Sequence, residues 1–172
     1  MRRDTRVILQ PVGGQEATAH YIKTVRNQVQ LSTIAPVLSL ESAQQLKSEF
    51  KNGWCRVWGV TPGANGVNRG KWERFAVGDR VLFCGESRVF ASGSLRYKMH
   101  SRELALLLWG RDADGQTWEY TYFFGAVRDH NIPVSKLAAA VGYQPGYNVL
   151  GVNILDSQKS AAVLEAFDLT DD

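Results

Sequence analysis

RVWGVTPGANGVNRGKWERFAVGDRVLF, residues 56–83, is the stretch that sets the fold. An apolar, β-branched segment over Cys55–Val60 predicts a strand that carries Trp58 near its end. A Gly- and Asn-rich loop follows, and Gly78–Asp79 predicts a turn into a second strand over Arg80–Cys84. Because glycine lets backbone approach a ligand and asparagine offers both donor and acceptor groups, this loop is predicted to border a pocket walled by Trp58.

The flanking sequence adds short central strands and helices on either side of them. Strands are predicted at Arg6–Gln10, at Arg88–Lys98 with a bend at Gly93, and at Thr117–Phe124, while Glu103–Trp109 fits either a strand or a short helix. Helices are predicted at Gln15–Gln30, from Ser39 or Ser42 to Phe50, from Pro133 or Ser135 to Val141, and at Ser157–Phe167. The short loops favour antiparallel pairing, so we expect an α+β fold with a small, strongly bent, mostly antiparallel sheet or barrel flanked by helices.

Length and composition indicate one ordinary globular domain. The chain has 172 residues, of which 44% are apolar and 22% charged, so residues 1–172 are expected to form one domain, a fragment or module of a larger protein. A run of about 18 apolar residues and a secretory signal are both missing, which predicts a cytoplasmic protein without membrane contact. Cys55 and Cys84 are expected to be reduced, and no Cys/His cluster has metal-ligand spacing, so neither a metal nor another cofactor is expected.

Charge is segregated along the chain. Residues 51–111 carry 11 basic and 4 acidic side chains, whereas residues 112–172 carry 3 and 9. A basic middle segment suits contact with phosphates, although folding could also scatter these side chains over several solvated faces.

Catalytic motifs are missing from the sequence. It contains no phosphate loop, dinucleotide fingerprint or nucleophile elbow. His20, His100 and His130 lie in different predicted elements and none has a paired carboxylate nearby in the sequence, so they are expected to be structural, and His100 is a candidate phosphate ligand. We therefore expect a binding domain and not an enzyme.

Five tryptophans are a high count for this length. Trp54 and Trp118 are predicted to be core residues, whereas Trp58, Trp72 and Trp109 each lie where a strand meets a loop. A tryptophan at a pocket rim can stack on a nucleobase, although each one alone is more often a packing residue.

The order of the motifs RVWG, VGDRVLF, GSLRYK, LLLWG and TWEYTYFF resembles the EVE/YTH branch of the PUA-like superfamily. Over roughly Arg6–Tyr143 it is most similar to the reader domains at the N-termini of modification-dependent (type IV) restriction systems, in McrB-like proteins and in fusions to HNH nucleases. The resemblance implies a domain that binds double-stranded DNA, flips a methylated base (6-methyladenine in first place) into an aromatic cage, and acts with a nuclease or AAA+ motor domain in cis or in trans.

The same resemblance assigns roles to particular residues. It implies a cage of Trp58 and Trp109, with Trp72 as a third tryptophan in the loop, and it implies that Gln10, Thr61 and Asn65 read the edge of the base. Basic side chains would hold the phosphates without reading sequence. They are Arg69, Lys71, Arg74, Arg88, Arg96, Lys98, His100 and Arg102.

Three other functions stay open at this point. The first alternative is an RNA-binding PUA-like module that reads methylated RNA, which contacts to the 2′-hydroxyl would distinguish from a DNA reader. The second is a small-molecule or enzymatic PUA-like fold, and the third is a purely structural interaction domain. Similarity of fold alone does not decide among them.

Overall fold

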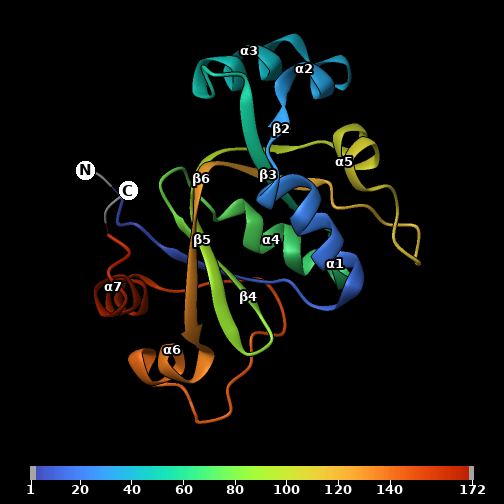
Figure 1. The fold of residues 1–172 in the computed structure, drawn as a ribbon. Helices are drawn as coiled ribbons and strands as arrows, with labels where there is room; N and C mark the ends of the chain where they lie inside the picture. Colours follow the sequence, from blue (N-terminus) through green and yellow to red (C-terminus); the bar gives the residue numbers. More distant parts are fainter. Residues whose placement is uncertain (1–2, 171–172) are drawn as a thin grey trace.

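A computed structural model describes residues 3–170, in which strands and helices build one open, curled sheet with helices around it (Figure 1). The strands are β1 Val7–Pro11, β2 Val29–Gln30, β3 Trp54–Val60, β4 Arg80–Gly85, β5 Arg88–His100, β6 Tyr120–Pro133 and β7 Asn153–Ile154. The α-helices are α1 Gly14–Tyr21, α2 Leu31–Ile34, α3 Leu40–Glu49, α4 Val67–Glu73, α5 Arg102–Trp109, α6 Val134–Val141 and α7 Ser157–Ala166. Short turns of other helix types are the π-helical η1 Ile22–Arg26 and the 3₁₀ turns η2 Ala35–Val37 and η3 Ala64–Gly66.

The sheet has the order β2-β3-β6-β5-β4-β1-β7. Every pair is antiparallel except β1–β4, in which Val7 lies opposite Arg80 and Gln10 opposite Phe83. The expected α+β class with a mostly antiparallel, bent sheet is therefore confirmed. A parallel pair needs a long crossover, and here the chain from α1 to α4 provides it.

Two long strands curl the sheet. The β5–β6 register shifts between Val89 and Ala91 and again on both sides of Leu95, and such bulges bend a strand and increase its twist. The bend expected at Gly93 lies within this region, where an added Cβ would approach the carbonyl oxygen of Ala126 to 3.3 Å. As a result, β1 and β3 lie near opposite ends of the strand order but face the same core.

That shared core, the inner cluster, lies inside the curl. Its buried members are Ile8, Val12, Val25, Trp58, Val60, Phe75, Val81, Phe83, Ala91, Leu95, Tyr120, Tyr122, Phe124, Val152 and Ile154. Helix α1 and η1 fill the seam between β1 and β3, where the Thr24 hydroxyl donates to the Val57 carbonyl over 2.6 Å. The seam is thus closed by a helix and not by strand pairing.

Two further clusters lie on the outer side of the strands, as the alternation of side chains requires. The outer cluster joins Val7, Leu9 and Leu82 to α6 and α7, and the insert cluster joins Val57 and Phe123 to α3 and α5. Figure 1 shows α2 and α3 at one end of the sheet and α6 and α7 toward the other.

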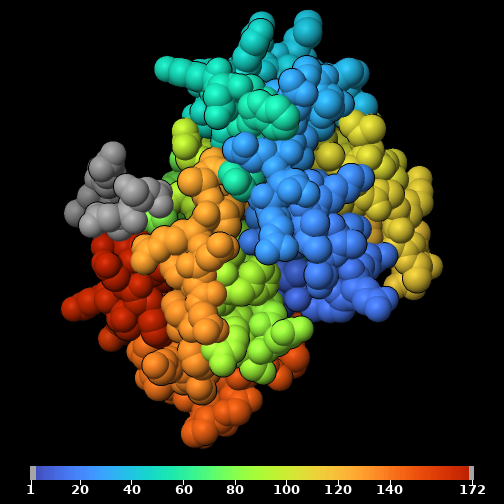
Figure 2. Space-filling model, viewed as in Figure 1, coloured from blue at the N-terminus to red at the C-terminus, as the bar shows by residue number. Residues whose placement is uncertain are grey.

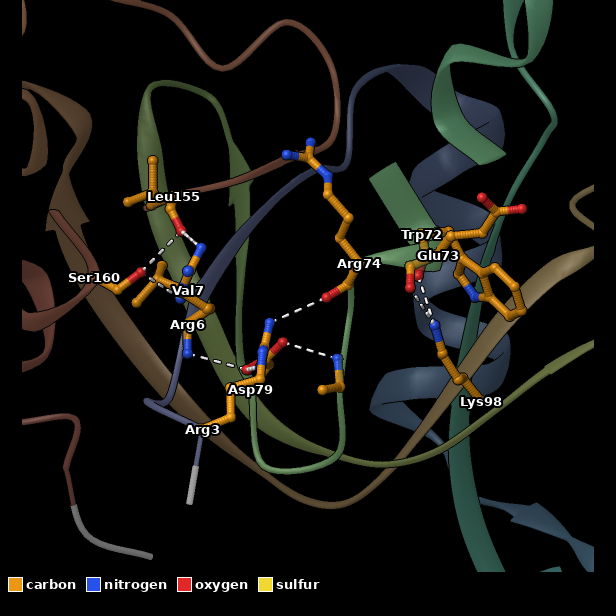
Figure 3. Close-up of polar contacts among 11 residues, drawn as sticks. Arg3, Arg6, Val7, Trp72, Glu73, Arg74, Asp79, Lys98, Leu155 and Ser160 are labelled. Atoms are coloured by element: carbon orange, nitrogen blue, oxygen red, sulfur yellow. Dashed lines mark hydrogen bonds and ion pairs between the residues drawn. The ribbon is translucent and has the colours of Figure 1, made fainter. Parts of the chain in front are cut away.

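A buried carboxylate fixes the start of the β1–β4 pair (Figure 3). Asp79, with a side chain only 1% exposed, accepts hydrogen bonds from the Arg6 and Ala76 backbone N–H groups at 3.0 and 2.9 Å. It also pairs with the Arg3 guanidinium over 2.6 Å, and Arg3 donates to the Arg74 carbonyl over 3.0 Å. The predicted Gly78–Asp79 turn is therefore also the anchor of the N-terminal strand.

Several predicted elements have different bounds. The loop expected after Trp58 contains η3 and α4, because Asn65 and Gly66 with positive φ turn the chain into a helix that Gly66 caps. The single helix expected over Gln15–Gln30 ends at Arg26, since Val29 and Gln30 pair with β3. Glu103–Trp109 is a helix, α5, which the Ser101 hydroxyl caps. Ser39, and not Ser42, caps α3.

Both cysteines are free thiols buried in the sheet. Burial raises the pKa of Cys55 and of Cys84 to about 12, so both stay protonated at neutral pH. Within residues 3–170, no helix is long and apolar enough to span a bilayer.

Asp79→Ala is expected to lower the free energy of unfolding by about 3 kcal/mol, because two backbone donors and Arg3 lose their buried acceptor. Urea unfolding followed by tryptophan fluorescence measures the change. Asp114→Ala, which removes an exposed carboxylate from the loop before β6, is the matched control and should shift stability by less than about 0.5 kcal/mol. Equal midpoints for both variants would contradict the anchoring role of Asp79.

Candidate functional site

A cavity of about 470 Å³ opens beside the seam between β1 and β3. We call it the seam cavity. Its lining comes from the end of β1, the start of α1, the end of β3, α4 and the segment before β7, and consists of Gln10, Pro11, Gly13, Ala17, Trp58, Gly59, Val60, Thr61, Asn68, Trp118, Val149, Leu150, Gly151 and Val152. Ligand sites commonly measure about 300–1,000 Å³. Among the residues described, this lining contains no charged side chain, so the cavity suits a neutral, flat group better than an ion.

Gln10 is held in one orientation at the seam cavity. The side chain is 4% exposed, its Oε1 accepts a hydrogen bond from the Tyr122 hydroxyl, and its Nε2 donates to the Pro11 carbonyl over 3.0 Å. Tyr122 is buried, and burial raises the pKa of its hydroxyl, which therefore stays a donor at neutral pH. One N–H of the Gln10 amide is left over, so a ligand with an acceptor atom can bind there.

Trp58 belongs to the inner cluster and also lines the seam cavity. It is 4% exposed and packs against Phe83 and Tyr21, with ring centroids 6.0 and 6.4 Å apart. Within residues 3–170 its buried indole N–H has no hydrogen-bond partner. Trp58 thus lines the same cavity as Gln10 and Thr61, two of the polar residues named from the sequence.

Gly59 lets the backbone of Trp118 and the ring of Trp109 approach β3 closely. A Cβ on Gly59 would clash with the Trp118 carbonyl oxygen and lie 2.7 Å from Cζ3 of Trp109. The Trp118 backbone therefore crosses β3 on the side that Trp109 also covers. Trp118, although it was predicted to be a core residue, also belongs to the lining of the seam cavity. The pairing of Val60 with Tyr120 brings the residues just before Tyr120 beside Thr61, and no local pattern in the sequence reveals that pairing.

Trp109 and Trp72 lie outside the lining of the seam cavity. Trp109 packs on the opposite face of β3 from Trp58, in the insert cluster, with its ring 5.9 Å from His20. The indole N–H of Trp72 donates to the Thr121 carbonyl over 3.1 Å, and Lys98 lies 4.2 Å above its ring. The structure thus does not gather the three predicted cage tryptophans around one cavity, since strand alternation and the α4–β6 contact separate them.

The three residues predicted to read the edge of the base are not all at the seam cavity either. Thr61 lines the seam cavity with Gln10, whereas Asn65 is exposed in η3 and lies outside the lining. Asn68 of α4 lines the seam cavity and supplies the side-chain amide that was expected from Asn65. Asn68 was not among the candidates named from the sequence. Its side chain lies so close to Gly63 that an added Cβ would be 2.9 Å from Cγ.

The His20 ring packs against the rings of Trp118 and Trp109. Its ring meets the Trp118 ring edge-on at 4.4 Å. Burial is the main cause that lowers the pKa of His20, so the ring is neutral at pH 7 and adds no charge beside the cavity.

Five of the predicted phosphate ligands gather at the end of the sheet next to the seam cavity. The register places Val60, Tyr120 and His100 side by side, and the His100 ring stacks on Tyr120 at 4.5 Å. Lys98 donates to the carbonyls of Trp72 and Glu73, which links β5 to α4. This group, the basic rim, consists of Arg69, Lys71, Lys98, His100 and Arg102.

Members of the basic rim are partly neutralised. Arg69 pairs with Glu73 over 3.0 Å, and both His100 and Arg102 contact the carboxylate of Glu119, at 2.9 and 3.1 Å. The Arg69–Glu73 pair is exposed on both sides, so Arg69 can exchange its partner for a phosphate oxygen at small cost. Glu119 is only 11% exposed, so His100 and Arg102 are held more firmly by it.

Arg88 and Arg96 lie apart from the basic rim, and the Arg74 side chain points away from Lys98 and Trp72 (Figure 3). Arg96 pairs with Glu49 of α3 over 2.6 Å, and Arg88 donates to the Asn131 side chain over 2.6 Å. Arg88 borders a second cavity of about 590 Å³, between α1 and the β4–β5 hairpin, with Arg26 and Arg56 and with Glu86 and Asp129. Figure 2 shows this face, with the green hairpin between the orange strand β6 and the blue helix α1.

Comparison with known proteins supports the fold. No protein-family model matches the chain, and no curated protein matches it. Among solved structures, the chain is similar to the N-terminal domain of Thermococcus gammatolerans McrB bound to m5C DNA, with a TM-score of 0.68 and 12% identity over 96% of this chain and 98% of that chain. The likeness extends past Tyr143, where the sequence resemblance ends, to the segment that completes the seam cavity.

Gly59→Ala is expected to lower the free energy of unfolding by about 1–3 kcal/mol, because the new methyl group displaces Trp118 and Trp109. Thermal unfolding measures stability, and near-ultraviolet circular dichroism reports the movement of the indoles. Gly70→Ala in α4 is the control, since its Cβ would meet nothing within 4 Å, and alanine should stabilise this helix by roughly 0.5–1 kcal/mol. A Gly59→Ala protein as stable as the wild type would contradict the close approach.

Proposed function

We propose that this domain binds double-stranded DNA that carries a methylated base and holds that base, rotated out of the duplex, in the seam cavity. The observation that carries the proposal is an uncharged cavity lined by Trp58, Trp118 and the fixed amide of Gln10 beside a basic rim. The fold is similar to that of an McrB N-terminal domain bound to m5C DNA, which supports a McrB-like reader of modified bases; the EVE/YTH type is what the sequence resemblance implies.

Extrusion explains why the cavity needs aromatic walls. A base inside a duplex cannot enter a closed site, and rotating it out costs a few kcal/mol. Stacking on an aromatic side chain contributes about 1–3 kcal/mol per base. Trp58 and Trp118 are the two indoles that the lining offers for this, with Gln10, Thr61 and Asn68 at the edge of the ring.

The single remaining N–H of Gln10 selects for an acceptor on the Watson–Crick edge. N1 of 6-methyladenine, the base implied by the sequence resemblance, and N3 or O2 of a methylated cytosine both supply one. The methyl group itself adds only about 0.8 kcal/mol of burial. Discrimination must therefore also come from polar groups, such as Thr61 and Asn68, that an unmethylated amine would leave badly paired.

The basic rim is proposed to hold the phosphates next to the extruded nucleotide. Contacts of this kind position the protein on DNA without reading sequence. In this proposal the domain itself carries no catalysis, and a nuclease or motor domain in cis or in trans acts on the bound DNA.

Trp118→Ala is expected to weaken binding to a methylated duplex by about 5- to 150-fold, because one stacking surface is lost. Fluorescence anisotropy with otherwise identical duplexes that carry 6-methyladenine, 5-methylcytosine, 4-methylcytosine or no mark measures the effect and identifies the base. Methylated single-stranded RNA is included as a further ligand.

Trp54→Ala is the matched control, since this indole is exposed at the start of β3 and lies outside the seam cavity. Circular dichroism verifies that both variants fold. Equal affinity of wild type and Trp118→Ala for every marked duplex would contradict the site, and preference for the RNA would support the alternative reader of methylated RNA.

Affinity for DNA is expected to fall steeply with salt, with a slope of log K against log salt of about −0.9 for each phosphate neutralised. Lys71→Gln in the basic rim should make this slope less steep by about one unit. Lys136→Gln, on the exposed side of α6, should leave the slope unchanged. A wild-type affinity that does not respond to salt would point to a ligand without phosphates.

A further inference from the structure

Leu150 is exposed at the mouth of the seam cavity. Its side chain is 88% exposed, the highest fraction among the large apolar side chains of residues 3–170. It also belongs to the lining of the cavity, between Val149 and Gly151. Single exposed leucines are common on protein surfaces, but this one stands beside the site where an extruded base is proposed to bind.

The loop that carries Leu150 is anchored on both sides of it. Tyr147 and Val149 pack against the outer cluster, while Val152 is buried in the inner cluster. Immediately after Val152, β7 pairs with β1, where Asn153 lies opposite Leu9, the neighbour of Gln10. Leu150 is therefore the projecting tip of a short, firmly held segment, and its position relative to Gln10 is fixed.

Charge does not prevent this loop from approaching DNA. Residues 142–152 contain no charged side chain, so no carboxylate within the loop opposes the phosphates on either side of a target base.

We propose that Leu150 enters the base stack in the space that the extruded base leaves. This proposal rests on the proposed function. Extrusion removes one stacking partner from each of the two neighbouring bases. Proteins that distort DNA often insert an apolar side chain such as leucine between bases that have lost their stacking. Leu150 exchanges its exposure to water for contact with the two flanking bases only when the duplex is opened, so it stabilises the extruded state specifically.

The experiment compares Leu150→Ala with wild type on two DNA ligands that carry the same methylated base. One is a fully paired duplex, and the other is the corresponding single strand, which has no stack to open. Leu150→Ala is expected to weaken binding to the duplex by about tenfold and to change binding to the single strand less than twofold. Leu150→Met, which keeps an apolar wedge, is expected to restore most of the duplex affinity.

Leu40→Ala is the matched control, because Leu40 is 85% exposed but lies at the start of α3, away from the seam cavity. It should bind both ligands as the wild type does. A 2-aminopurine placed next to the methylated base gives a second readout, since its fluorescence rises when the stack opens, and the rise should be smaller with Leu150→Ala.

Equal losses on both ligands would overturn the proposal, because Leu150 would then contact the base itself. The absence of any loss on the duplex would overturn it as well. If instead wild-type protein does not distinguish methylated from unmethylated DNA in either form, the proposed function fails and the role of Leu150 fails with it. The wild-type measurements therefore separate the two failures.

Discussion

A buried carboxylate at the start of β4 determines where the functional residues of this domain can lie. Asp79 ties the backbone of Arg6 to the turn before β4 and so sets the parallel register of β1 against β4. That register carries Gln10 to the end of the pair, opposite Phe83 and within reach of the Tyr122 hydroxyl. An interaction just before β1 thus fixes an amide near the other end of the strand, about four residues or roughly 13 Å away.

The end of β3 lies between an apolar surface and a surface that carries basic side chains. Gly59 allows Trp118 and Trp109 to pack against the strand, and their rings, together with neutral His20, form an apolar wall. Cationic side chains collect beyond that wall, on α4 and at the end of β5, where His100 and Arg102 share Glu119. The uncharged cavity and its charged border are therefore built from adjacent parts of the same sheet edge, which suits a ligand with a flat neutral ring on an anionic backbone.

Local patterns in the sequence were enough to predict the elements but not the contacts between them. Alternation and turn residues located the strands around Trp58, Asp79 and Gly93, and the charge of residues 51–111 pointed to the basic rim. Which tryptophans share a cavity depends on the β3–β6 register and on which face of β3 each ring covers, and neither can be read from the spacing of Trp58, Trp109 and Trp118. The parallel β1–β4 pair and the contribution of residues 149–152 were missed for the same reason, since both arise from long-range pairing.

The lining of the seam cavity comes from four separate connections of the chain, which join β1 to α1, β3 to α4, α5 to β6 and α6 to β7. The strands that carry the hydrophobic clusters contribute only their last residues to it. Loops tolerate substitution and insertion better than the elements that they connect. Substitutions in one loop can therefore reshape one wall of the cavity while the scaffold that carries the other walls stays the same.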